Sequence, residues 1–120
     1  MNDRVIELKS ARTGAGRIGG RTVLNPKTSI TYQNSEEIEA MIHDSLKRNK
    51  TEIILDCKSV SFMDSVALEL INQVHEDLKN RGGILKLVGL NAICRDILLA
   101  TRLMNEFNVY TDVHEAIKSV

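Results

Sequence analysis

The 120-residue sequence has few aromatic side chains and few cysteines. It contains two Tyr, two Phe and no Trp, and no basic stripe is interleaved with them. Binding of single-stranded nucleic acid by base stacking is therefore disfavoured. The two cysteines, Cys57 and Cys94, have neither a second Cys nor a His at metal-ligand spacing. The sequence thus predicts no disulfide framework and no metal site, and we expect two reduced, partly buried thiols.

The sequence also lacks an excess of charge and a long apolar run. Its 16 basic and 16 acidic residues cancel, so no overall field draws it to nucleic acid or to an anionic membrane. No run of about 18 apolar residues is present, and the polar start at Asn2, Asp3 and Arg4 does not resemble a signal peptide. We expect a cytoplasmic protein with no direct nucleic-acid or membrane contact. Residues 1–27 hold six basic residues against two acidic ones, which indicates a solvated arm, with a nucleic-acid arm as the alternative.

The length is that of one domain, covering residues 1–120. A short strand is expected at Val5–Leu8, and the glycines that follow predict a flexible loop or hairpin tip over residues 10–21. The segment Gly14–Gly19 fits the dinucleotide pattern G-x-G-x-x-G. A helix should open at those glycines, but β-prone residues and Pro26 follow, so nucleotide sensing is the weakest hypothesis.

Hydrophobic periodicity predicts alternating strands and helices from residue 52 onward, a pattern typical of a parallel α/β sheet. In the helix expected to begin near Asn91, the side chains of Ile93, Ile97 and Ala100 are predicted to face inward. The expected extended segments are Arg21–Leu24, Thr28–Tyr32, Glu52–Asp56, Ile84–Val88 and Phe107–Tyr110, and the expected helices begin near Asn34, Asp64, Asn91 and Asp112.

One polar pair stands where function is usually found in such a sheet. Asp56 closes a buried strand, and Asp64-Ser65 begins the next helix, so these residues are predicted to share the rim at the carboxyl ends of the strands. A hydroxyl at a helix start tolerates a phosphate, because free backbone N–H groups and the helix dipole stabilise negative charge. The same pair is also what an ordinary capped helix has, and the local pattern does not separate the two interpretations.

Several short motifs resemble the STAS family, best known from bacterial anti-sigma factor antagonists. The motifs are Ile53–Asp56, Val60–Ser65 with Leu68, and Gly82–Leu87, and the likeness extends through Arg95, Leu98, Thr101 and Ala116-Ile117. It covers about residues 51–120. The resemblance implies a STAS-like mixed α/β sheet of about four to five strands with about four helices. The family continues Asp-Ser with a small residue and Gly-Leu, whereas this chain has the bulkier Val66-Ala67-Leu68.

The resemblance implies a regulatory protein that is not an enzyme and needs no cofactor or metal. Ser65 would be the phosphoacceptor, and the unphosphorylated form would bind a serine kinase that is also an anti-sigma factor. Phosphorylation would release it, and a serine phosphatase would reset the cycle. The expected partner-binding residues are Asp56, Met63, Asp64, Ser65, Val66 and Glu69.

Other interpretations stay open at this point. The chain could be a non-catalytic scaffold subunit of a signalling or transporter-associated complex in which Ser65 only caps a helix, and homodimer formation is left open. A Ser-His-Asp hydrolase is disfavoured, because Ser65 lacks the flanking glycines of a nucleophile elbow. Phe62 is expected in the core.

Overall fold

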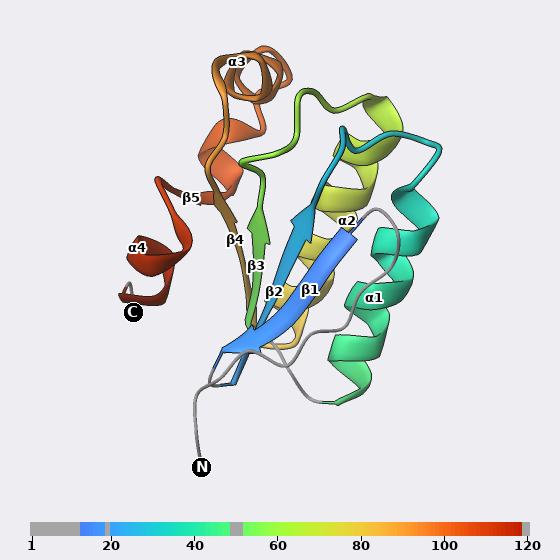
Figure 1. Cartoon of the computed structure of the whole chain (residues 1–120), viewed down its shortest axis with the longest axis vertical. Coiled ribbons are helices and arrows are strands. Elements are labelled where there is room, and N and C mark those ends of the chain that lie inside the picture. Colours follow the sequence, from blue (N-terminus) through green and yellow to red (C-terminus); the bar gives the residue numbers. More distant parts are fainter. Residues whose placement is uncertain (1–12, 19, 49–51, 119–120) are drawn as a thin grey trace.

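Five strands form one mixed sheet. The computed structural model describes residues 13–18, 20–48 and 52–118. The spatial order is β1-β2-β3-β4-β5, with β1 antiparallel to β2 and the other neighbours parallel (Figure 1). The strands are β1 (Thr13–Ile18), β2 (Arg21–Pro26), β3 (Glu52–Asp56), β4 (Ile84–Val88) and β5 (Asn108–Tyr110). The helices are α1 (Ser35–Lys47), α2 (Ser65–Asn80), α3 (Ala92–Ala100), the short 3-10 turn η1 (Met104–Glu106) and α4 (Val113–Lys118). This confirms the predicted STAS-like arrangement.

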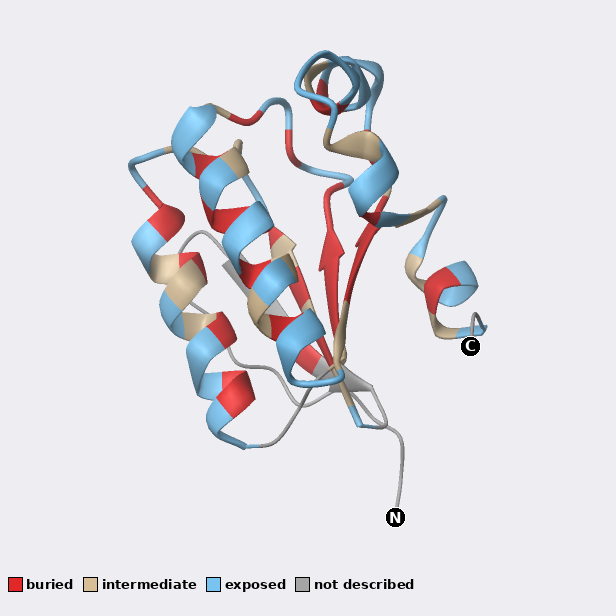
Figure 2. Ribbon diagram, turned by 180° about the vertical axis from the view of Figure 1, so that it is seen from behind, coloured by how far each residue is buried: buried red, intermediate tan, exposed pale blue. Residues whose placement is uncertain are grey.

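The two faces of the sheet are covered unequally. Helices α1 and α2 lie side by side on one face, whereas α4 lies on the other, as Figures 1 and 2 show. Each of the two long helices buries one apolar stripe against the sheet, as their period of 3.6 residues requires. The core on the α4 side is small and is centred on Ile54, Val88 and Ala116. No helix in the described part of the chain is long and apolar enough to cross a bilayer.

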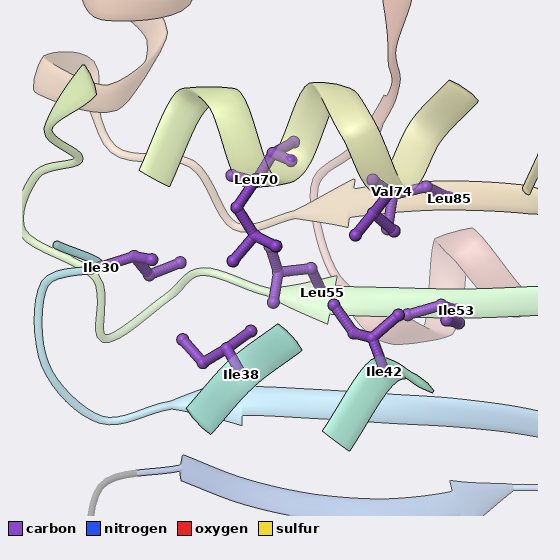
Figure 3. A pocket seen from close by; sticks show the side chains of 9 residues that line it. Ile30, Ile38, Ile42, Ile53, Leu55, Leu70, Val74 and Leu85 are labelled. Carbon is purple, nitrogen blue, oxygen red and sulfur yellow. The ribbon is translucent and has the colours of Figure 1, made fainter. Parts of the chain in front are cut away.

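The larger core between the sheet and α1 and α2 is tightly filled. Side chains from α1, α2, β3 and β4 converge there (Figure 3), and the space left among them is about 10 Å³. That is about the room of one water molecule, so this interior offers no ligand cavity. The labelled side chains are Ile30, Ile38, Ile42, Ile53, Leu55, Leu70, Val74 and Leu85.

A buried lysine ties α4 to the sheet. Lys86 is 3% exposed, and its Nζ donates to Glu52 Oε2 at 3.0 Å and to the Ala116 carbonyl at 2.8 Å. Arg21 Nε donates to the same Glu52 oxygen at 2.9 Å. A buried charge is tolerated when it is paired and hydrogen-bonded in this way.

Two expectations for the N-terminal third of the chain are only partly met. The glycine-rich segment does form one arm of a hairpin, but Thr13–Ile18 is not a loop, because these residues pair with β2 as the edge strand β1. Cross-strand pairing thus outweighs the weak strand propensity of glycine. Thr28–Tyr32, expected to be a strand or an extended segment, adds no strand to the sheet: Ile30 makes an isolated bridge to Met63, and a turn follows it. The strand expected at Val5–Leu8 and residues 10–12 lie outside the described residues.

The inward face of α3 also differs from the prediction. Cys94 and Leu98 are buried, whereas Ile93 is 57% exposed and Ala100 is exposed. The apolar pattern of α3 covers more of the helix circumference than one face, so periodicity alone could not select the buried side.

Candidate functional site

Two helix starts and their loops meet at the carboxyl-terminal edge of the parallel strands. One loop leads from β3 to α2 and the other from β4 to α3 (Figure 1). The loops are joined by Asn91, whose Nδ2 donates to the carbonyls of Val60 and Ser61 at 3.2 Å each. Gly89 has φ +69°, and a Cβ there would lie 3.2 Å from the Lys58 backbone nitrogen, so this close approach requires glycine. These contacts hold the two loops in fixed positions relative to each other.

Asp64 fixes the start of α2. It is the N-cap residue, and its Oδ1 accepts from the Ala67 N–H at 2.9 Å. Its Oδ2 accepts from the Tyr32 N–H at 2.8 Å, which ties the loop between β2 and α1 to the same point. Both carboxylate oxygens are thus used within the fold, and the charge of Asp64 is held in one position beside Ser65.

Ser65 is the first residue of α2 and is exposed. Within the described residues its hydroxyl makes no hydrogen bond, so it is available to a second molecule. The structure confirms that this side chain stands at the surface where a helix begins. A phosphate on it would meet the positive end of the helix dipole, so the folded chain could accept the added charge.

Exposed apolar side chains lie on the segments next to Ser65. Tyr32 is 68% exposed, Phe62 45% and Val66 40%, and Glu69 is also exposed. The expectation that Phe62 belongs to the core is wrong. Half of the four Tyr and Phe residues are therefore exposed at one edge of the molecule. Exposed aromatic side chains are frequent anchors of protein interfaces.

The expected partner-binding residues separate into two groups. Ser65, Val66 and Glu69 lie exposed on the first turns of α2, with Asp64 half-buried before them. Met63 is 3% exposed and packs in the core, so its side chain is not presented to a partner. Tyr32 was missed, because its link to Asp64 joins residues far apart in the sequence and leaves no local signal.

Asp56 ends β3 at this edge, but its side chain is buried and is not part of the exposed surface at Ser65. It is 4% exposed and is held by Lys58, with the Asp56 Oδ2 to Lys58 Nζ distance at 3.3 Å. Successive strand residues point to opposite faces, so Asp56 shares the side of Ile54, away from the face covered by α2. Both residues lie at the carboxyl-terminal edge, but the Asp56 side chain faces the side of the sheet opposite to α2.

Two other sets of reactive side chains lie outside the Ser65 region. Both cysteines are buried and free, and burial raises the pKa of Cys57, with the neighbouring Cys94 and Asp56 adding to the effect. Burial also raises the pKa of Cys94. One histidine and two glutamates have possible metal-ligand atoms within 4.8 Å of one another. Both glutamates are exposed, and the sequence had shown no metal-ligand spacing for this histidine. The three residues are His75, Glu76 and Glu106.

Comparison with known proteins gives one consistent result. The family model for the STAS domain matches residues 13–116. A protein of Thermotoga maritima, named as a candidate anti-sigma factor antagonist, is 22% identical with a TM-score of 0.84, over 88% of this chain and 92% of that one. The Bacillus cell fate determinant SpoIIAA, solved in its phosphorylated form, is 21% identical with a TM-score of 0.65, over 95% and 96%. A part of SLC26A9 is 16% identical with a TM-score of 0.71, over 84% of this chain and 20% of that one. At these identities the structural likeness shows the fold.

Proposed function

The chain belongs to the STAS domain family, and on that premise we propose that it is an anti-sigma factor antagonist controlled by phosphorylation of Ser65. In its unphosphorylated form it binds a serine kinase that is also an anti-sigma factor. Phosphorylation releases it, and a serine phosphatase restores the binding form. In this role the domain is a cytoplasmic, non-catalytic binding module.

One observation carries the proposal: Ser65 is exposed at the start of α2 with its hydroxyl unbonded within the described chain, and the segments next to it present exposed apolar side chains. A kinase needs a hydroxyl that can reach the γ-phosphate, and a stable complex needs apolar contact area. Ser65 supplies the hydroxyl, and Tyr32, Phe62 and Val66 supply the area. The solved phosphorylated form of SpoIIAA, a protein of the same fold, supports the proposal by analogy.

Release follows from the geometry of phosphoryl transfer. The kinase must place its nucleotide phosphates against the Ser65 hydroxyl, so the new phosphoserine faces the remaining diphosphate. Phosphorylation adds about −1.5 to −2 charges, and the carboxylate of Asp64 is held beside it by two N–H groups. In the complex, the phosphoserine and the diphosphate therefore repel each other. In the free protein, the start of α2 stabilises the dianion. The switch therefore acts on binding and leaves the fold intact.

The test is a kinase and binding assay with purified candidate kinases of the anti-sigma type from the same organism. Incubation with ATP and mass spectrometry should place one phosphate on Ser65. Ser65→Ala should bind the kinase without being modified, and Ser65→Asp should lose binding by about 100-fold or more, as loss of a central contact does. Ser61→Asp is the matched control, because it adds the same charge to an exposed position in the loop that precedes α2.

The two outcomes are distinct. Normal binding by Ser61→Asp and loss of binding by Ser65→Asp support the switch. If Ser65 stays unmodified with every kinase and Ser65→Asp binds as the wild type does, the proposal fails.

A scaffold role is the second candidate, and the likeness to one part of the much longer SLC26A9 chain favours it. In that case Ser65 serves only as the first residue of a capped helix. A stable large complex whose size and composition are unchanged in Ser65→Ala and Ser65→Asp would support the scaffold and contradict the switch.

A further inference from the structure

A groove runs between the first turns of α1 and α2. Its volume is about 480 Å³, and its lining residues include Tyr32, Glu36, Glu39, Val66, Glu69 and Gln73. The two helices that border it lie next to each other on the same face of the sheet (Figure 2). Val66 belongs both to the groove and to the surroundings of Ser65, so a molecule that reaches Ser65 lies at the end of the groove.

The groove combines exposed apolar side chains with negatively charged ones and has no positive charge among its lining residues. Tyr32 and Val66 are exposed, and three glutamates line the groove without a basic residue among its lining side chains. The four ion pairs found in the described part of the chain involve none of these three glutamates. A cation to match Glu36, Glu39 and Glu69 must therefore come from another molecule or from the solvent.

The helix dipole explains only part of this charge. Glu36 lies in the first turn of α1, where a negative charge is stabilising. Glu39 and Glu69 are each the fifth residue of their helices, beyond the turn in which that effect acts. Two carboxylates of this kind face a shared groove in which like charges repel each other. A basic partner group would relieve that repulsion.

We propose that the groove binds a basic amphipathic segment of a partner protein. The apolar side chains of that segment pack on Tyr32 and Val66, and its Lys or Arg side chains pair with Glu36, Glu39 and Glu69. The groove proposal rests on the proposed function in one respect. It specifies the chemistry of a second surface of the kinase, which lies next to the surface that holds the nucleotide. Attraction at the groove and repulsion at phosphorylated Ser65 then act on two separate parts of the partner.

This division gives the two regions different kinetic roles. Charges at the rim of an interface mainly set the association rate and its dependence on salt. The groove glutamates should therefore steer the partner, whereas the state of Ser65 decides whether the complex persists. Loss of the glutamates should slow association about tenfold at low ionic strength and much less at high salt, because screening shortens the range of the attraction.

The experiment uses synthetic peptides as probes, so it does not depend on identifying the kinase. ¹⁵N-labelled full-length protein is titrated with an 18-residue helical peptide that carries Arg beside a Leu stripe, and with a second peptide in which every Arg is replaced by Glu. We expect amide shifts at Tyr32, Glu36, Val66 and Glu69 with the Arg peptide only. Binding should weaken about tenfold between 20 and 200 mM salt.

Two triple variants locate the site. E36Q/E39Q/E69Q neutralises the groove, and E76Q/D96N/E106Q removes the same charge from exposed positions that do not line the groove. The groove variant should lose the Arg-peptide shifts, whereas the control variant keeps them, and thermal melting shows that both are folded. Equal weakening in both variants, equal shifts with the Glu peptide, or shifts confined to other surfaces would each overturn the proposal.

The outcome is separable from that of the phosphorylation switch. Ser65→Asp should bind the Arg peptide at least as well as the wild type, because it adds negative charge next to the groove. Its kinase binding should nevertheless be lost. Peptide binding without kinase phosphorylation would keep the groove and reject the switch, and the reverse result would reject the groove alone.

Discussion

The starts of α2 and α3 have nearly the same backbone geometry. Asp64 has φ −90° and ψ −177°, and Asn91 has φ −80° and ψ 176°. Each accepts a hydrogen bond from the N–H three residues later, at 2.9 Å from Ala67 and at 2.8 Å from Cys94. The residues at these two equivalent positions, Ala67 and Cys94, are both fully buried. As local structures, the two caps are interchangeable.

The two helix starts differ in the residue next to the cap and in the other contacts of the capping side chain. Ser65 comes after Asp64 and Ala92 comes after Asn91, and both of these residues are exposed. Asp64 is anionic and braces the loop that contains the exposed Tyr32, whereas the neutral Asn91 donates to the loop before α2. The pair shows that a cap alone does not make a phosphorylation site. The hydroxyl and the exposed apolar surroundings distinguish the start of α2.

The largest effect is expected when the serine is moved from one helix start to the other. In the double variant S65A/A92S an exposed serine occupies the first position of α3 behind a capping residue of the same geometry. We expect the phosphorylation rate to fall about 100-fold or more, since a misplacement of about 1 Å already costs about that much. Radiolabel incorporation by the cognate kinase measures the rate.

The single variant A92S is the control for this transfer. It keeps Ser65 and should be phosphorylated at the wild-type rate, with one phosphate per chain. If S65A/A92S is labelled at residue 92 as fast as the wild type at Ser65, any exposed serine at a helix start is sufficient. The surroundings of Ser65 would then carry no specificity.

Removal of the caps should affect stability equally at the two helix starts. Asp64→Ala loses the cap and the acceptor of the Tyr32 N–H, and Asn91→Ala loses the cap and two donors to the neighbouring loop. Each should lower the free energy of unfolding by about 2 kcal/mol, about 1 kcal/mol for the cap and about 1 kcal/mol for the further bonds. Urea unfolding followed by circular dichroism measures the loss.

Ser61→Ala is the reference for these two variants, because it changes an exposed side chain in the loop that precedes α2 and should shift stability by less than about 0.5 kcal/mol. A loss below that level for either cap variant would show that the two starts are not structurally equivalent. Only Asp64→Ala should in addition weaken kinase binding, because it frees the loop that carries Tyr32.

The sequence was sufficient for features that depend on neighbouring residues. Both caps follow from an Asx residue before an apolar periodic run, and β3 and β4 follow from short apolar runs bounded by polar residues or glycine. The surface position of Ser65 follows from its place just after a cap. In each case the deciding interactions lie within a few residues, and the family motifs lie in the same segments.

Features that depend on distant partners were not available from the sequence. Thr13–Ile18 is a strand because β2 lies beside it, and Tyr32 joins the site because Asp64 holds its N–H. The outward position of Ile93 reflects which side of α3 packs on the core, where Cys94 and Leu98 are buried. The Asp56 side chain is buried because strand alternation places it on the side of Ile54, where Lys58 pairs with it.

The smallest predicted effect concerns Cys57, which lies in the turn that leads toward the start of α2. Burial, together with Cys94 and Asp56, raises its pKa in the folded chain, whereas an unfolded cysteine ionises near pH 8.5. Above that pH the unfolded chain releases a proton that the folded chain retains, so the free energy of unfolding falls as the pH rises. The stabilising contribution is complete below about pH 8.5 and decreases above it.

Between pH 8 and 9.5 the wild type should therefore lose about 1 kcal/mol more stability than Cys57→Ala, in which this proton is absent. Urea unfolding at the two pH values measures the difference, and other titrating groups cancel between the two proteins. Cys94→Ala gives α3 the residue, alanine, that α2 has at the equivalent position. This variant should remove a further part of the pH dependence of stability, because burial raises the pKa of Cys94 as well. If neither variant changes the pH dependence, Cys57 and Cys94 ionise in the folded chain as freely as in the unfolded one. The two thiols would then be open to solvent, contrary to their burial in the structure.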